Sequence, residues 1–202
     1  MHTRHFTLGI ALLLLTGVVG TASAKTQKFH CKGGGSFTDG VETNIDTNGD
    51  GASAKVDQGA QVCNLGNAVF QEEAEWIERP AVTSACPAGT TLELYIDATH
   101  GQQRAVFTDE DTGDQGFSQI TSATQCFNAS TFTFTGFGKG IIIGGTGKNT
   151  GATGTFTNRF SGSYLQFGFK NGVFGGFGQF TFTSDGTVNL PNAGNGHDGK
   201  DD

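Results

Sequence analysis

Residues 131–135 read Thr-Phe-Thr-Phe-Thr, and residues 179–183 read Gln-Phe-Thr-Phe-Thr. In an extended chain, neighbouring side chains point to opposite faces, so both segments place phenylalanine on one face and polar residues on the other. Burying the aromatic face removes a large apolar area from water. The two segments therefore predict β-strands that each have one buried face.

Further strand candidates surround these two segments. Thirteen of the eighteen phenylalanines lie between Phe117 and Phe182. The candidates are residues 27–32, 36–45, 52–63, 68–82, 91–98, 102–108, 154–160 and 163–169. Helical propensity competes with the extended form only at residues 71–79. Closely spaced strands with glycine-rich turns predict an all-β fold, an antiparallel meander that closes into a single eight-stranded β-barrel. Closure also removes the exposed edges of a Phe-rich sheet.

Four Phe-Gly pairs occur within this region. They begin at Phe137, Phe167, Phe174 and Phe177. Such pairs occur in low-complexity segments. The period-two pattern around them favours another interpretation, in which each phenylalanine belongs to the core and each glycine forms a bend or bulge.

The composition excludes some functions. The chain has 202 residues, 12 Lys and Arg, 19 Asp and Glu, and a formal net charge of −7. An acidic chain with so few cations neutralises few phosphates, so we expect no nucleic-acid partner. A transmembrane barrel is an alternative for alternating strands, but two Tyr and one Trp do not supply its aromatic girdles.

Residues 1–24 have the pattern of a secretory signal peptide. Arg4 supplies a positive start, residues 8–19 are apolar, and Ala22-Ser23-Ala24 fits the cleavage pattern. The apolar run is shorter than the ~20 residues of a membrane span. We therefore expect a secreted or periplasmic protein without a transmembrane span in its mature chain. Residues 25–188 are the predicted barrel domain, and residues 189–202 are a predicted disordered polar tail.

Four cysteines lie within the predicted mature chain: Cys31, Cys63, Cys86 and Cys126. An even number in an exported chain predicts two disulfides. Four cysteines allow three pairings, and the sequence does not choose among them. We prefer Cys31–Cys63 with Cys86–Cys126, because this pairing closes the shortest loops. The spacing typical of a zinc site is absent from the sequence.

Residues 46–51 read Asp-Thr-Asn-Gly-Asp-Gly, which matches the first half of a calcium-binding loop. The candidate ligands are Asp46, Asn48, Asp50, the carbonyl of Ala52, and Asp57 at the twelfth position. Asp57 has a shorter side chain than the usual glutamate. The alternative is a metal-free hairpin turn, since Asn-Gly and Asp-Gly favour turns without any ion. If calcium binds, we expect a structural role.

No catalytic motif is complete in the sequence. The glycine-rich stretch at 144–150 lacks the first glycine and the hydroxyl residue of a phosphate-binding loop. The histidines of the mature chain are scattered, and surface positions are expected for each. Glu72, Glu73, Glu75 and Glu78 could supply a carboxylate pair for acid–base chemistry. A solvated face is the favoured interpretation of this acidic cluster.

Residues 144–154 read Gly-Gly-Thr-Gly-Lys-Asn-Thr-Gly-Ala-Thr-Gly and follow a Thr/Phe strand. This segment resembles the GGTGxFxGATG motif of allene oxide cyclase-like and dirigent-like β-barrel proteins, and of exported bacterial proteins that share it. The resemblance covers residues 130–183. Asn149 departs from it, because the motif has an aromatic residue there. The resemblance implies an eight-stranded barrel with a central cavity, and no catalytic residue is carried over. The glycines themselves predict a tight strand connection or barrel corner.

Two kinds of function follow from these observations. The favoured one is a non-enzymatic binding or structural protein that takes a small apolar ligand or an extracellular partner. The alternative is an isomerase or stereochemical guide of the allene oxide cyclase or dirigent type, acting on a small apolar substrate. A cavity lined by paired carboxylates, by Arg104 or by Arg159 would favour the enzyme. A filled interior would leave a structural or interaction role.

Overall fold

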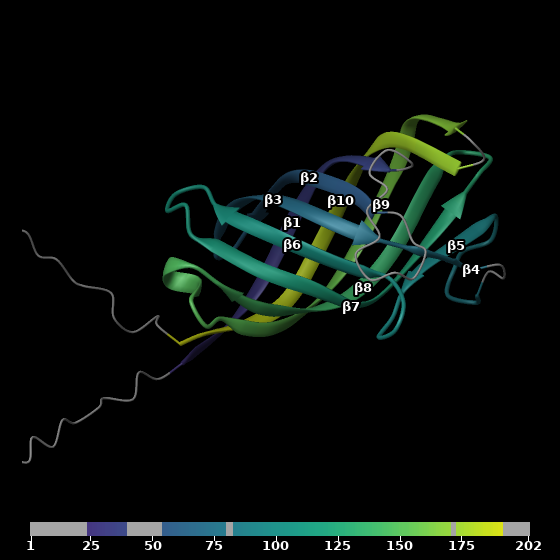
Figure 1. Ribbon diagram of the computed structural model, residues 1–202. Helices are drawn as coiled ribbons and strands as arrows, with labels where there is room; N and C mark the ends of the chain where they lie inside the picture. The colour runs from purple at the N-terminus through teal and green to yellow at the C-terminus, as the bar shows by residue number, and fades with distance from the viewer. Residues whose placement is uncertain (1–23, 40–53, 80–82, 171–172, 192–202) are drawn as a thin grey trace, which may run out of the picture.

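The architecture is all-β (Figure 1). The computed structural model describes residues 24–39, 54–79, 83–170 and 173–191. Within these ranges there are ten β-strands, one short 3-10 helix (η1, Gly147–Asn149), and no α-helix. The predicted signal peptide, except for its last residue, and residues 192–202 of the predicted tail lie outside the described residues. The boundary predicted for the tail is wrong by two residues, because Asn189 and Leu190 belong to β10, where they pair with β1.

Eight strands form a closed antiparallel barrel, as predicted. They are β1 (Lys25–Asp39), β2 (Ala54–Cys63), β3 (Gly66–Glu75), β6 (Gln102–Asp109), β7 (Gln115–Asn128), β8 (Thr133–Gly145), β9 (Thr153–Lys170) and β10 (Val173–Leu190). The first strand pairs with the last, from Lys25 opposite Leu190 onward. Figure 1 shows this pair as the purple and yellow ribbons. The barrel closes because β7 pairs with both β6 and β8.

Two short strands extend the sheet beyond the barrel. These are β4 (Ile77–Arg79) and β5 (Leu92–Ile96). The β5 strand pairs with the second half of β7, whereas β6 pairs with the first half. The segment 71–79, where helical propensity competes, is extended in β3 and β4 except at Trp76. Pairing with β2 and β6 outweighs the weak local preference for a helix.

Large and small side chains alternate inside the barrel. The Phe134 and Phe160 rings lie against Gly162 and Gly136, where a Cβ atom would come within 2.5 and 2.2 Å of them. Phe156 covers Gly140 in the same way, at 2.3 Å. These glycines leave room for the rings of neighbouring strands, which is how an eight-stranded barrel accommodates so many phenylalanines.

Only one of the two alternating segments, 131–135 and 179–183, lies entirely within a strand. Phe180 and Phe182 both line the barrel interior, as predicted. Phe134 is also buried, but β8 begins only at Thr133. Phe132 precedes the strand with a φ of 55°, and its ring stacks on Phe167 at 3.9 Å between centroids. The strict alternation therefore overestimated the length of β8 by two residues.

The prediction for the Phe-Gly pairs is wrong in its direction. Phe137, Phe167 and Phe177 are 40–45% exposed on the outer face, while Gly138 and Gly178 are buried. The alternation has the opposite phase at Phe137 and Phe177, so the following glycine points inward, whereas Gly168 is exposed. The predicted bulge is found at one pair, where the register between β9 and β10 shifts between Phe177 and Gly178. The side chain of Phe174 lies outside the described residues.

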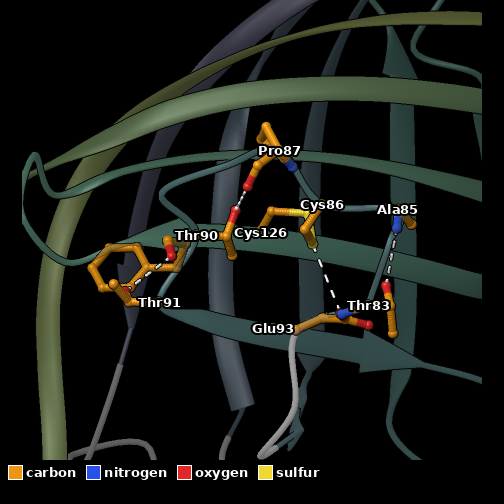
Figure 2. The surroundings of a disulfide bond; sticks show 9 residues. Thr83, Ala85, Cys86, Pro87, Thr90, Thr91, Glu93 and Cys126 are labelled. Carbon is orange, nitrogen blue, oxygen red and sulfur yellow. Dashed lines mark hydrogen bonds between the residues drawn. A yellow bond between two sulfur atoms is a disulfide. The ribbon is translucent and has the colours of Figure 1, made fainter.

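Both disulfides have the preferred pairing. Cys31–Cys63 joins β1 to β2 at directly opposed positions, and Cys86–Cys126 joins the segment before β5 to β7. Figure 2 shows the second bond beside the buried Glu93. The Glu93 carboxylate accepts a hydrogen bond of 2.6 Å from the Thr83 amide. The second disulfide thus fixes the segment that extends the sheet beyond the barrel.

Candidate functional site

An inner cavity of about 70 Å³ lies within the barrel. Its apolar wall includes seven phenylalanines: Phe70, Phe107, Phe134, Phe156, Phe160, Phe180 and Phe182. Its polar side chains include Lys55, Asp57, Glu72, Gln103 and Asn158. Every strand that reaches this cavity contributes alternate residues, because a strand points every second side chain inward. The interior is therefore lined by aromatic rings around a group of charged and amide side chains.

Lys55 carries an ammonium group into this aromatic interior. The residue is 6% exposed, and its Nζ atom lies 3.4 Å from Oδ1 of Asp57. The same Nζ atom lies 4.5 Å from the centroid of the Phe37 ring and 5.5 Å from that of Phe134. A buried cation needs such compensation, which a carboxylate and the negative faces of aromatic rings provide.

Two carboxyl groups face each other beside Lys55. Asp57 of β2 and Glu72 of β3 are directly opposed in the ladder, and both line the cavity. Burial raises the pKa of Glu72 from 4.5 to about 8, and the neighbouring charge of Asp57 adds to this rise. Hydrogen bonds link Glu72 to Gln103 and to Asp57. At neutral pH the Glu72 carboxyl is therefore protonated and can donate a hydrogen bond.

A second pocket of about 190 Å³ forms the mouth of the barrel. It shares five lining residues with the inner cavity: Gln61, Phe107, Ser118, Phe156 and Ser184. Its own lining adds the apolar side chains of Phe29, Leu65 and Phe117. The two spaces adjoin, so the polar group at the inner end connects to a mainly apolar opening.

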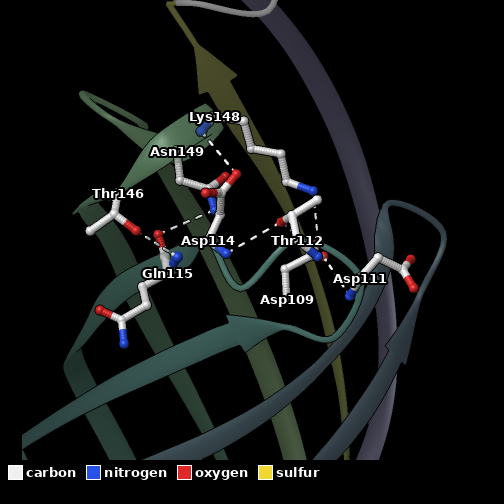
Figure 3. A network of polar contacts seen from close by, with 8 residues as sticks. All are labelled: Asp109, Asp111, Thr112, Asp114, Gln115, Thr146, Lys148 and Asn149. Atoms are coloured by element: carbon white, nitrogen blue, oxygen red, sulfur yellow. Dashed lines mark hydrogen bonds and ion pairs between the residues drawn. The ribbon is translucent and has the colours of Figure 1, made fainter.

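The glycine-rich motif forms part of the rim of this mouth (Figure 3). The Lys148 amide donates to Asp114 at 3.1 Å, and the Asn149 side chain donates to the carbonyl of Gln115 at 3.2 Å. Gly147 has a φ of 51°, and a Cβ atom there would lie 1.8 Å from Oδ1 of Asp114. Only glycine fits this position. The motif thus forms a tight connection between β8 and β9, as predicted, and fastens it to the turn before β7.

An ion pair crosses the same rim. Nζ of Lys148 lies 2.6 Å from Oδ2 of Asp109. This hydrogen bond, together with the amide of Thr112, lowers the pKa of Asp109 from 3.8 to about 2. Asp109 stays ionised across the physiological range, so the rim keeps this contact while Glu72 inside holds a proton.

The structure reaches only one residue of the predicted calcium loop. Asp57 lies inside the barrel, where its carboxylate is paired with Lys55. Asp46, Asn48, Asp50 and Ala52 lie outside the described residues. Among the residues that are described, no group of three or more His, Cys, Asp or Glu side chains is placed to hold a metal ion. Calcium binding stays a prediction, which thermal melts with EDTA and with calcium, repeated on Asp50→Ala, would test.

The acidic cluster is not the solvated face that its composition indicates. Glu72 faces the cavity and Glu75 is fully buried, whereas Glu78 is exposed. The period-two pattern from Phe70 through Glu72 to Ala74 could have placed Glu72 inside. Lys55, Trp76 and Asn158 also line the cavity, and sequence reasoning did not single them out. Arg104 and Arg159 are exposed and do not line it.

His30 and His100 lie at the surface, as expected, each beside an aspartate. The described part of the chain has no helix that is long and apolar enough to cross a membrane. No protein-family model, curated protein or solved structure matches this chain. Its function must therefore be argued from the chemistry of the barrel itself.

Proposed function

We propose that this protein is an exported barrel that binds a small, mainly apolar molecule in its interior. One observation carries the proposal: the mouth pocket and the inner cavity share lining residues and together lead from the rim to the polar side chains. Their walls are mainly apolar, with phenylalanines concentrated in the inner cavity, and a few polar side chains lie in that cavity. Ligand sites in barrels typically have this combination of apolar walls and a small polar set.

Trp76 provides the test of binding. It lines the inner cavity, and it is the single tryptophan of the chain. Cyclohexanol is a suitable probe, because it is small, mainly apolar and soluble. We expect a saturable change in tryptophan emission on titration. Absence of any saturable response to this probe or to its cyclic analogues, by fluorescence and by calorimetry, would overturn the proposal.

A matched pair of variants separates the interior from the outer face. Ala105 lines the cavity, whereas its neighbour Val106 is exposed on the outside. We expect Ala105→Phe to abolish the response and Val106→Phe to retain it. Ser118→Leu fills the passage between the two spaces and serves if Ala105→Phe does not fold. Retention of full affinity in a folded cavity-filling variant would contradict the proposed site.

The carboxyl pair supports a second candidate, an isomerase or stereochemical guide acting on a small apolar substrate. Asp57 is paired with Lys55, and the opposed Glu72 has a raised pKa. An ionised base beside a protonated acid is the arrangement that proton-transfer catalysis needs. Asp57 would take a proton from a carbon next to a carbonyl group, and Glu72 would give its proton to the carbonyl oxygen.

Deuterium exchange tests this second candidate. Cyclohexanone in D₂O exchanges its α-protons through the same two proton transfers, and NMR follows the loss of the α-proton signal. We expect acceleration by the protein, with Asp57→Asn and Glu72→Gln losing it and Glu78→Gln retaining it. If the ketone binds but exchanges at the rate of buffer, the protein is a binder and this candidate is excluded.

A further inference from the structure

We propose that the inner end of the cavity recognises a neutral hydroxyl group, so that the ligand is a small apolar alcohol with its hydroxyl pointing inward. This inference rests on the proposed function, because it specifies the chemical class of the ligand at the same site. It comes from three polar atoms of the cavity wall.

These three atoms are buried and have no hydrogen-bond partner among the described residues. They are Oδ1 of Asp57, Oδ1 of Asn158 and Nε1 of Trp76. Asp57 itself is only 4% exposed. Lys55 lies within ion-pair distance of Asp57 but makes no hydrogen bond to this oxygen. Buried polar atoms nearly always make hydrogen bonds, so three atoms without a hydrogen bond around one cavity point to a group that bonds with them.

The types of these atoms select the ligand. Two of them accept hydrogen bonds and one donates. A hydroxyl group has one proton to donate and two lone pairs to accept, so it can serve both kinds of atom at once. A ketone and an ether only accept, and therefore leave both Asp57 and Asn158 unpaired. A hydrocarbon serves none of the three.

The charges of the cavity exclude ionic head groups. Lys55 and Asp57 balance each other, and Glu72 is neutral when protonated. A carboxylate would face the anion of Asp57 and the amide oxygen of Asn158 with no proton to offer. An ammonium group would face Lys55. Bringing either ion into an aromatic interior carries a desolvation cost that no unpaired opposite charge offsets.

The remaining lining sets the orientation of the ligand. The unpaired atoms belong to the inner cavity, whereas the mouth pocket adds Phe29, Leu65 and Phe117. A hydroxyl at the inner end places the hydrocarbon part of the molecule along the phenylalanines toward the mouth. Water is the competing occupant of the polar end, and an alcohol would replace it while burying apolar surface.

The experiment compares three probes that share one ring and differ in the head group: cyclohexanol, cyclohexanone and cyclohexanecarboxylate. Affinities are measured by calorimetry at pH 7 on the purified protein. We expect the alcohol to bind at least about tenfold more tightly than the other two, since one additional buried hydrogen bond accounts for such a factor. Equal affinities of alcohol and ketone would overturn the inference.

Two variants assign the selectivity to named atoms. Asn158→Leu removes an acceptor at similar size, and Trp76→Phe removes the donor. We expect each to bring the affinity for cyclohexanol down toward that for cyclohexanone, with the ketone changed less. Thr157→Val is the matched control, because Thr157 is the exposed neighbour of Asn158 on β9. An unchanged alcohol-to-ketone ratio in both folded variants would contradict the assignment.

The failures of the two proposals are distinguishable. If none of the three probes binds, the proposed binding function itself is wrong. If all three bind equally and cavity-filling variants block them, the binding function stands and only the head-group inference fails. If Asn158→Leu does not fold, Trp76→Phe alone still tests the head-group selectivity, because it keeps an aromatic ring in place.

Discussion

Single residues decide how this barrel responds to pH. Glu72 keeps its proton in the folded protein up to a pKa of about 8, whereas the unfolded chain loses it near 4.5. Between these values the unfolded state binds fewer protons than the folded state. The free energy of unfolding therefore falls as the pH rises through this window. Below about pH 4.5 the carboxyl group is protonated in both states, so it no longer changes the free energy of unfolding with pH.

Glu72→Gln tests this dependence. The variant has no proton to lose, so we expect it to match the wild type near pH 4.5 and to be more stable above pH 8, by roughly 2 to 4 kcal/mol. Urea unfolding from pH 4.5 to 9 measures the difference. Glu78→Gln, on an exposed glutamate, should follow the wild-type curve. A Glu72→Gln curve parallel to the wild type would contradict the raised pKa.

Gly147 is the second residue with a decisive role. Gly147→Ala places a methyl group against Asp114 and forces a left-handed backbone on alanine. We expect a loss of roughly 3 kcal/mol in the free energy of unfolding, from backbone strain and the disturbed rim. Gly113→Ala is the matched control, because Gly113 also has a positive φ of 75° but a Cβ atom there would meet no other atom within 4 Å. It should lose only about 1 kcal/mol. Equal losses would show that the contact with Asp114 is unimportant.

The elements differ in how firmly they are held. Strands of the barrel have a long partner on each side, whereas β5 pairs with β7 on one side and only with the three-residue β4 on the other. The Cys86–Cys126 bond ties the segment before β5 to β7. Replacing both cysteines of this bond with alanine should cost about 4 kcal/mol, given the 40-residue separation. We also expect faster hydrogen exchange in residues 92–96.

Replacing Cys31 and Cys63 should lower the free energy of unfolding by a similar amount without that local effect, because β1 and β2 are each paired with a strand on both sides. Unchanged exchange in β5 would contradict this account.

The alternation of phenylalanine and threonine was enough to predict the barrel, and loop length was enough to prefer the correct disulfides. The polar interior was not predicted, because Lys55, Asp57 and Glu72 are residue types that usually face water. These side chains come together only because the register of β2 and β3 places Asp57 opposite Glu72. The sequence does not reveal that register unless it also specifies the turn between the two strands. The prediction for the Phe-Gly pairs was wrong for a related reason. An alternating pattern shows that successive side chains point to opposite faces of the sheet, but it does not show which of the two sets faces the core.

At the scale of the whole molecule, the two ends of the barrel chain lie together. Lys25 and Leu190 are paired neighbours in the ladder. We therefore expect a circular permutant that joins them by a short linker, with new ends between Asn64 and Leu65, to fold. Its thermal melt should be cooperative, with a Tm within several degrees of the wild type, and cyclohexanol should bind as before. Loss of a cooperative melt would mean that the connection between β2 and β3 is essential to the fold.

The pairing of the first strand with the last also governs when this protein can finish folding. A chain emerging from the ribosome or a translocation channel exposes β1 first, yet one edge of β1 has no partner until β10 has emerged. Until then the inward phenylalanines of a partly formed sheet are open to wrong partners. The order of synthesis thus makes the late C-terminal strand the step that completes the structure, and contacts so distant in sequence are slow to form.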